Sequence, residues 1–284
     1  MAKTYNNIYL DARQRLRRAG VEQAQLEARE LICFATGKTR DELLRDMNLY
    51  AVSSVENQIE SVMRRRISGE PLAYILGEWS FYGMDLTITP DVLIPRPDTE
   101  VVAERAIQIA KGAGEHARVL DLCTGSGAIG LAVAKNAPNC HVVLGDISDA
   151  ALTVARKNSY RVGAKVVTTK VDALKPPTDA LWDYNLIVCN PPYIRTADME
   201  TLDISVKNFE PHLALDGGED GLKFYRFIAE NWRGAMRSTC ILLFEIGYDQ
   251  ADDVEKILAE NGYRNIKRHK DAFGNWRAVE ASVS

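Results

Sequence analysis

The chain has 284 residues, of which 46% are hydrophobic and 26% charged, a composition typical of a globular protein with one large or two smaller domains. Its 35 Lys and Arg residues against 39 Asp and Glu residues give a net charge of −4, which argues against sequence-blind binding of nucleic acid. No apolar run approaches the roughly 20 residues that cross a bilayer, and no C-x-x-C motif occurs. We therefore expect no membrane span, no metal site and a reducing, cytoplasmic location.

Residues 1–75 are expected to form a small helical domain. Apolar side chains recur at helical spacing over residues 5–16 and again over 24–35. Thr39-x-x-Glu42 and Ser53-x-x-Glu56 both match the capping box that opens a helix, so a third and a fourth helix are predicted. A bundle of this size has only a small core, so we expect it to lean on a neighbouring domain or on a partner.

Residues 76–98 are rich in glycine, proline and alternating aromatic side chains, which favours a β-hairpin linker. Residues 99–284 repeat a pattern of strand, loop and helix. The expected strands are residues 118–122, 141–144, 165–171, 186–189 and 240–246. Short apolar strands separated by helices predict an α/β domain with a doubly wound, mostly parallel, Rossmann-like sheet.

A glycine-rich loop follows the first of these strands and opens a helix that runs to about residue 137. Gly125, Gly127 and Gly130 let a ligand approach the backbone N–H groups at the start of this helix. Their spacing also matches the G-x-G-x-x-G fingerprint of dinucleotide-binding proteins. The glycines alone therefore leave two cofactors open, a nicotinamide dinucleotide and S-adenosyl-L-methionine.

Three carboxylates favour the second cofactor, because each follows a strand of the expected sheet. Asp121 would repel a pyrophosphate but attract an ammonium or sulfonium group. Asp146 is suited to the ribose hydroxyls, and Asp172 to the adenine amino group. Since ligands of parallel sheets lie at the carboxyl ends of the strands, the three acids together predict a nucleoside cofactor.

The motif Asn190-Pro191-Pro192-Tyr193 ends the next strand. The two prolines fix an extended backbone and contribute no N–H group. The Asn190 side-chain oxygen and the Pro191 carbonyl can therefore both accept from one NH₂ group, while the Tyr193 ring packs on a planar amide or base. A rigid loop with a packed tyrosine is the alternative interpretation of these four residues taken alone.

The two motifs together resemble those of class I S-adenosyl-L-methionine-dependent methyltransferases that modify planar nitrogens. Further segments, over nearly the whole chain, are similar to the PrmC/HemK family of peptide chain release factor glutamine methyltransferases. These segments are Gly69–Gly77, Phe81–Gly83, Leu93–Glu100, Glu210–Pro211, Asp220–Leu222 and Glu245–Gly247 with Gln250. The resemblance implies a helical domain that engages the release factor, a hairpin linker and a domain that methylates the glutamine of a Gly-Gly-Gln loop.

The resemblance also assigns site residues and partners. The cofactor, which leaves as S-adenosyl-L-homocysteine, would contact Asp121, Cys123, Thr124, Gly125, Ser126, Gly127, Asp146, Asp172, Ala173 and Asn190. Substrate glutamine would be held by Asn190, Pro191, Pro192 and Tyr193, with Asn190, Pro191 and Tyr193 catalytic. No metal, nucleic acid or membrane is implied, and we expect a monomer. Cys123 departs from the family, whose commonest motif has glycine there.

Four other functions remain open at this stage. Glutamine methylation of a ribosomal protein would use the same chemistry, and an adenine-N6 DNA methyltransferase would bind its amine through the same two acceptors. The acidic balance of the chain argues against the DNA enzyme. A dinucleotide-dependent oxidoreductase and a catalytically silent binding module are the two alternatives from other classes.

Overall fold

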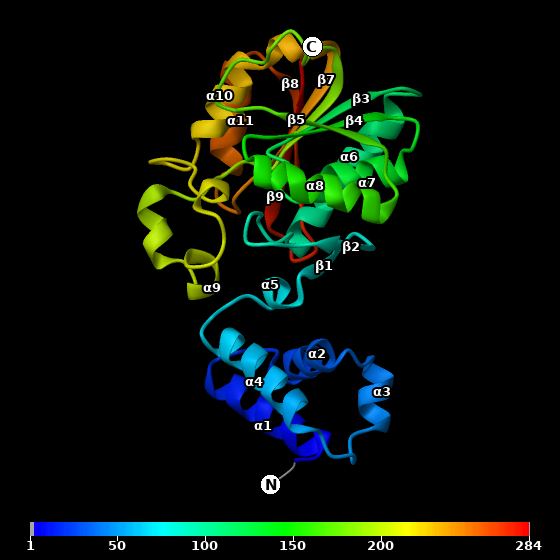
Figure 1. Ribbon diagram of the computed structural model, residues 1–284. Helices are drawn as coiled ribbons and strands as arrows, with labels where there is room; N and C mark the ends of the chain where they lie inside the picture. The colour runs from blue at the N-terminus through cyan, green and yellow to red at the C-terminus, as the bar shows by residue number, and fades with distance from the viewer. Residues whose placement is uncertain (1–2, 284) are drawn as a thin grey trace. The chain divides into compact units, whose positions relative to one another are not determined.

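The computed structural model describes residues 3–283, and the chain divides into two compact units (Figure 1). The first, here called the helical unit, contains the residues up to Gly77 together with Ile204–Phe209. The second, the sheet unit, contains Glu78–Asp203 and the chain from Glu210 onwards. The short segment 204–209 therefore lies far along the sequence from the rest of its unit, an arrangement that sequence periodicity does not indicate.

The helical unit is built from amphipathic helices whose apolar faces meet in a small core. Leu16, Leu31, Ile32 and Met63 are almost completely buried in this core. The helices are α1 (Tyr5–Arg18), α2 (Ala24–Thr36), α3 (Arg40–Arg45), α4 (Ser53–Ile67), α5 (Leu72–Leu76) and α9 (Ile204–Lys207). The first four agree with the helices expected from periodicity, whereas the short helices α5 and α9 were not predicted.

One of the two expected capping boxes forms and the other does not. The Thr39 hydroxyl accepts from the backbone N–H of Glu42, whose carboxylate accepts in return from the backbone N–H of Thr39. The prediction for Ser53 was wrong, because α4 begins one residue earlier than the motif requires and Val52 occupies the capping position. The Glu56 carboxylate instead accepts from the backbone N–H of Lys3, at 3.2 Å.

The sheet unit contains a seven-stranded sheet with the order β5-β4-β3-β6-β7-β9-β8. Its strands are β3 (Arg118–Leu122), β4 (His141–Asp146), β5 (Val166–Lys170), β6 (Tyr184–Cys189), β7 (Met236–Glu245), β8 (Arg264–Lys270) and β9 (Trp276–Ser282). Strands β3 to β7 are parallel, whereas β9 is antiparallel to both β7 and β8. The mostly parallel α/β fold is therefore confirmed, with two closing strands that the sequence pattern did not reveal.

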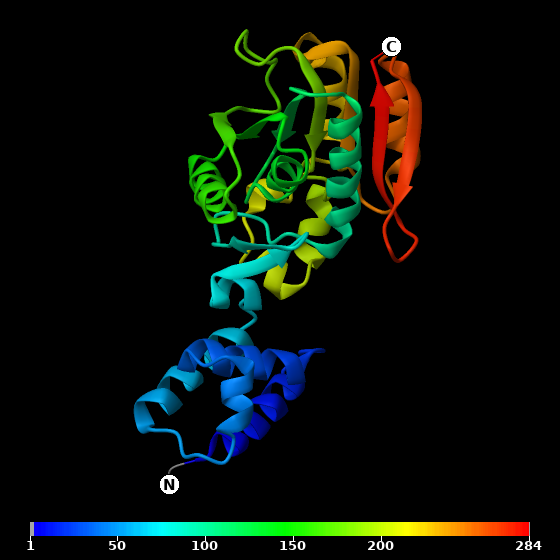
Figure 2. The same ribbon diagram turned by 90° about the vertical axis from the view of Figure 1, so that its right-hand side faces the viewer.

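Helices cover both faces of this sheet, with α6, α7 and α8 on one side and α10 and α11 on the other (Figures 1 and 2). Their bounds are α6 (Glu100–Gly112), α7 (Ala128–Asn136), α8 (Asp149–Val162), α10 (Lys223–Asn231) and α11 (Ala251–Glu260). A large buried cluster joins β3, β6 and β7 to α10 and α11 around Trp232 and Tyr225. No helix among residues 3–283 is both long and apolar enough to cross a membrane.

An antiparallel hairpin, β1 (Glu78–Phe81) and β2 (Met84–Thr87), precedes the sheet and packs on α8. Asn158 of α8 is completely buried and fixes the hairpin. Its side chain accepts from the Thr87 N–H at 2.7 Å and donates to the Thr87 carbonyl at 3.0 Å and the Ser126 carbonyl at 2.9 Å. One asparagine thus ties the hairpin to the glycine-rich loop.

Short 3₁₀ helices occur in the connections between elements of the sheet unit. They are η1 (Pro97–Thr99), η2 (Thr196–Thr201), η3 (His212–Ala214) and η4 (Arg233–Ala235). The first leads directly into α6, and the third belongs to the long connection between β6 and α10. Segments next to η1 and η3 reach the edge of the sheet at which the parallel strands end.

Candidate active site

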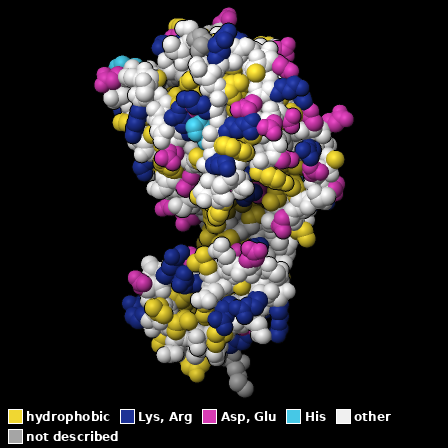
Figure 3. Space-filling model, turned by 180° about the vertical axis from the view of Figure 1, so that it is seen from behind, with side chains coloured by type: hydrophobic (Ala, Val, Ile, Leu, Met, Phe, Trp, Pro, Cys, Tyr) yellow, Lys and Arg dark blue, Asp and Glu magenta, His cyan; other side chains and the backbone are white. Residues whose placement is uncertain are grey.

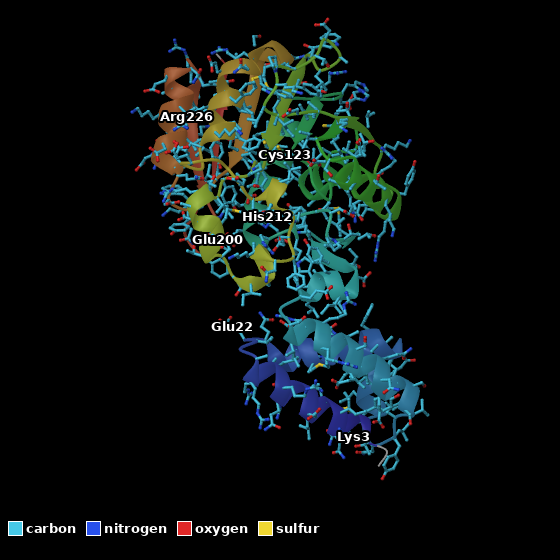
Figure 4. The ribbon with its side chains drawn as sticks, turned by 60° about the vertical axis from the view of Figure 1, so that its left-hand side comes forward. Lys3, Glu22, Cys123, Glu200, His212 and Arg226 are labelled. Carbon is cyan, nitrogen blue, oxygen red and sulfur yellow. The ribbon has the colours of Figure 1, made fainter. Side chains whose placement is uncertain are left out.

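A pocket opens at the carboxyl-terminal edge of the parallel strands. Its empty volume is about 1130 Å³, part of which is open solvent. The loops after β3, β4, β5 and β6 all contribute to its lining, and parts of segments 91–99 and 211–214 complete the wall. Figure 4 marks Cys123 in the first of these loops and His212 in the last segment.

The glycine-rich loop turns sharply between β3 and α7. Gly127 caps α7 with a φ of 87°, a left-handed conformation that glycine adopts without steric cost. Cys123 has a φ of 61°, which costs an ordinary residue about 1–2 kcal/mol. Glycine would adopt this backbone conformation without that cost. The Cys123 side chain lines the pocket, and its proximity adds to the burial that raises the pKa of the Cys189 thiol.

Asp121 lies in the pocket wall but is only 1% exposed. Its Oδ2 atom accepts from the Thr124 hydroxyl at 2.5 Å and from the Gly130 N–H at 2.8 Å. Burial raises the pKa of Asp121 to about 7, although these two hydrogen bonds oppose the rise. One of its oxygens is therefore already engaged in holding the loop against the start of α7.

Asp146 ends β4 and bridges two neighbouring loops. Its Oδ2 atom accepts from the Gly125 N–H, and its Oδ1 atom accepts from the Ser148 N–H, both at 2.9 Å. Burial raises the pKa of this carboxyl group, and backbone hydrogen bonds partly offset that effect. The carboxylate thus lines the pocket at a fixed position, beside the loop expected to hold the cofactor.

The loop after β5 brings Asp172 and Ala173 into the same pocket. The Asp172 carboxylate accepts from the Leu174 N–H at 2.9 Å and has the Lys175 ammonium at 3.6 Å. The Ala173 carbonyl accepts from the indole N–H of Trp232 at 3.1 Å. The indole anchors this loop from the buried cluster, so the backbone near Ala173 is fixed before any ligand binds.

The Asn-Pro-Pro-Tyr motif leaves β6 at the pocket, but its four residues differ in position. Asn190 and Pro192 line the pocket, Pro191 between them is buried, and Tyr193 packs against the buried cluster. Burial raises the pKa of Tyr193 well above its ordinary value, and its carbonyl accepts from Gln250 Nε2 at 3.1 Å. The structure therefore brings Asn190, but not the tyrosine ring, into the pocket wall.

Two acidic residues near the pocket were not expected as site residues. Glu210 is 3% exposed, accepts from the Ile94 N–H and pairs with Arg96, so it joins segments 91–99 and 211–214. Glu245 is 2% exposed and ends β7, the strand beside β6. Both occur in segments that carry the family resemblance, but only the folded structure reveals which residues they contact.

Two family models match the chain. The model described as "PrmC N-terminal domain" covers residues 8–77, and the one described as "Methyltransferase small domain" covers residues 106–215. A release factor glutamine methyltransferase from Geobacter sulfurreducens is 39% identical over 264 residues, which span 93% of this chain and 91% of the relative. Another from Moorella thermoacetica is 40% identical over 274 residues, 95% of each chain.

Solved structures share the fold at low sequence identity. The catalytic domain of hMettl16, in complex with MAT2A 3′UTR hairpin 6, has a TM-score of 0.57 at 16% identity, over 72% of this chain and 77% of that one. A methyltransferase from Pyrococcus furiosus has a TM-score of 0.51 at 16% identity, over 81% and 98% of the two chains. Both comparisons support the methyltransferase fold and carry no information on substrate.

Proposed function

This chain belongs to the release factor glutamine methyltransferase family, and from that membership we propose that it methylates the side-chain amide nitrogen of a release factor glutamine. The methyl donor is S-adenosyl-L-methionine, and the target glutamine is the one in the Gly-Gly-Gln loop. One observation carries the proposal: an asparagine at the end of β6 lines the same pocket as the glycine-rich loop. A nitrogen held by that asparagine would face the cofactor.

The pocket suits a sulfonium nucleoside better than a dinucleotide. Four of its lining residues are the carboxylates Asp91, Asp121, Asp146 and Asp172, and Arg96 is the cation among the lining residues that the structure describes. Such a charge balance opposes a pyrophosphate and favours a cation. Asp146 would hold the ribose hydroxyls, the glycine-rich loop the methionine part, and the backbone near residue 173 the adenine.

The residues of the chain act by positioning and by excluding water. Bound S-adenosyl-L-methionine supplies an electrophilic methyl group on a positively charged sulfur. The glutamine amide nitrogen is a weak nucleophile, because its lone pair is delocalised into the carbonyl. Asn190 Oδ1 and the Pro191 carbonyl would accept its two N–H bonds and fix its direction, and such alignment can lower a barrier by roughly 7–11 kcal/mol. The position of Tyr193 gives it a supporting role behind this loop.

The proposed activity is tested by mass spectrometry of a release factor incubated with the protein and S-adenosyl-L-methionine. We expect a mass increase of about 14 Da on the loop glutamine, and none when that glutamine is replaced by alanine. Parallel reactions with a ribosomal protein and with duplex DNA test the two other methyl acceptors. Modification of either one, without modification of the release factor, would contradict the proposal.

Asn190→Ala separates positioning from cofactor binding. It should abolish turnover, because the amide loses its acceptor, while the affinity for S-adenosyl-L-methionine, measured by titration calorimetry, stays within a few fold. Asn136→Ala is the matched control, since Asn136 lies exposed at the end of α7 and bonds only within its own helix. An Asn190 variant that keeps most of the wild-type rate would refute this role.

We propose that the helical unit recognises the release factor. It exposes several large apolar side chains, and apolar side chains are visible on its surface in Figure 3. The most exposed are Leu44, Tyr50, Val52, Ile204 and Leu49, which are 72%, 70%, 63%, 60% and 57% accessible. Exposed apolar groups of this kind suit a protein partner. Because release factors act in translation, we further propose that the protein acts in the cytoplasm. We also propose that it is a monomer.

A further inference from the structure

Glu245 lies directly beside Asn190, at the ends of two neighbouring strands. Strands β6 and β7 are parallel, and their register pairs Cys189 with Phe244. Asn190 and Glu245 are the next residue of each strand, so they leave the sheet side by side. Cys189 and Phe244 both face the buried cluster, and alternation along a strand therefore places Asn190 and Glu245 on the opposite face.

The Glu245 side chain stands just behind the pocket wall. Thr99 and Asn190, which line the pocket, both lie close enough to its carboxylate to lower its pKa. The residue is 2% exposed, and within residues 3–283 its Oε2 atom has no hydrogen-bond partner. Burying a carboxylate without full compensation is costly, and so an explanation in terms of stability alone is unsatisfactory.

The asparagine presents a problem of orientation that a carboxylate can solve. An asparagine amide has an oxygen that accepts and an NH₂ group that donates, and the two have nearly the same shape. To accept from a substrate NH₂ group, Asn190 must turn its oxygen toward the pocket and its own NH₂ group away. An ionised carboxylate only accepts, so it binds the NH₂ group and disfavours the reversed orientation.

We propose that Glu245 is a positioning residue that orients the Asn190 amide, so that its oxygen faces the methyl-accepting nitrogen. The kinetic part of this inference rests on the proposed function. The negative charge also polarises the amide, because hydrogen bonds in a chain strengthen one another in a buried site. Asn190 Oδ1 thereby becomes a better acceptor as positive charge develops on the attacking nitrogen.

The proposal predicts a loss of activity at low pH. Burial raises the pKa of Glu245 to about 7, opposed by Thr99, by the Arg277 charge and by Asn190, while Asp98 adds to the rise. Protonated Glu245 can donate to the asparagine oxygen and so favour the wrong orientation. The active form is the ionised one, and the rate should therefore fall as the pH drops through about 7.

Other titrating groups near Glu245 must be distinguished from it. Tyr193 and Tyr225 are also affected by the Glu245 charge, but their pKa values are raised and they stay protonated across this range. Asp121, in the same pocket, has a pKa of about 7 as well. If Asp121 causes the acidic limb of the rate profile, replacing Glu245 will leave that limb in place.

The test compares kcat, KM and the pH–rate profile of Glu245→Gln with the wild type between about pH 5.5 and 8.5. Glutamine keeps the size of the side chain, so the fold should survive. We expect kcat to fall at least about tenfold, S-adenosyl-L-methionine affinity to change less than about twofold, and the acidic limb to disappear. Glu245→Asp keeps the charge and should retain more activity than Glu245→Gln.

Glu280→Gln is the matched control, because Glu280 is also a buried carboxylate of this sheet, bonded to Arg105. It should keep the wild-type pH profile and a kcat within about twofold. A Glu245→Gln variant with near-normal kcat and an unchanged acidic limb would overturn the proposal.

A second readout requires no methyl acceptor. In ¹⁵N-labelled protein, the side-chain amide signals of Asn190, identified by their loss in Asn190→Ala, should titrate with a midpoint near pH 7. They should not do so in Glu245→Gln. A titration that persists in this variant would contradict the proposal. If the signals behave as expected but the wild type methylates no release factor, the proposed function fails while the positioning of Asn190 stands.

Discussion

Replacing Gly130 with alanine tests how closely α7 must approach the sheet to form the cofactor loop. A Cβ atom at this position would lie 2.2 Å from Leu144 Cδ2 and 2.9 Å from Asp121 Oδ2. Carbon atoms in contact are normally about 3.5–4.0 Å apart, so the leucine methyl group must move by more than 1 Å. Leu144 is fully buried, and its neighbours would have to shift as well.

The expected cost follows from two opposing effects. Overpacking a well-filled core costs roughly 1–3 kcal/mol, whereas alanine is favoured over glycine in a helix by about 1 kcal/mol. The net loss should therefore be about 0–2 kcal/mol, or a decrease in Tm of up to about 8 °C for a unit of this size. Since the Gly130 N–H also holds Asp121, we expect the affinity for S-adenosyl-L-methionine to fall at least about fivefold.

Thermal unfolding and titration calorimetry measure the two effects. Gly112→Ala is the control, because Gly112 ends α6 and a Cβ atom there would meet no atom within 4 Å. That variant gains helix propensity without a clash, and its Tm should equal or exceed that of the wild type. A Gly130→Ala protein with wild-type Tm and affinity would show that the close approach of α7 is not required.

Two further predictions concern buried polar groups. Asn158→Ala leaves three backbone groups of the hairpin and loop unpaired, so the free energy of unfolding measured in urea should fall by about 2–4 kcal/mol. The control Asn136→Ala should lower it by less than about 0.5 kcal/mol. Equal losses in the two variants would contradict this prediction. Interactions with Arg105 and His269 together outweigh burial and lower the pKa of Glu280 to about 2. This stabilisation is complete above about pH 4.5 and is lost toward pH 2, so the stability lost in Glu280→Gln should be smaller at pH 3 than at pH 6. A loss that is independent of pH would argue against this pairing.

The parts of the fold that could be predicted are those with strong local signals. Strand β3, the glycine-rich loop and α7 follow one another within 20 residues, and their apolar run, glycines and helical periodicity leave little choice. Strand β8 has no such signal, because it lies at the sheet edge and its sequence from Arg264 to Lys270 is mostly charged. Edge strands commonly carry charges, which hides them from pattern analysis.

The capping boxes show the limit of a local motif. The Thr39 and Ser53 segments have the same pattern, but only the first caps a helix. Whether a capping box forms depends on which backbone position begins the helix, and at Ser53 a long-range bond from Lys3 takes the glutamate that the box needs. The placement of segment 204–209 in the helical unit is likewise a long-range effect, which no window of the sequence contains.

Some residues of the candidate site could also be predicted from local sequence, whereas others depend on long-range contacts. Asp121 and Asp146 near the ends of β3 and β4, Asp172 just after β5 and Asn190 just after β6 all lie in one pocket. They do so because the carboxyl ends of parallel strands meet at one edge of the sheet. Glu245 ends β7 at the same edge, but the sequence alone does not show that it lies beside Asn190, which becomes clear only from the register of β6 and β7. Tyr193 shows the opposite case, since the motif suggests a ring facing the ligand and the structure packs it against the buried cluster.

Asp121 and Glu245 are both buried acids near strand ends, and both lower the stability of the sheet unit when they are ionised. Strand β6 lies between β3 and β7, and the register puts both acids on the same face of the sheet as Asn190. Burial raises the pKa of each to about 7, so each stabilises the fold less as the pH rises from about 4 through 7. Selection for stability alone would replace such groups. Their position on either side of the asparagine indicates that the sheet tolerates the loss of stability because the site needs charged acceptors there.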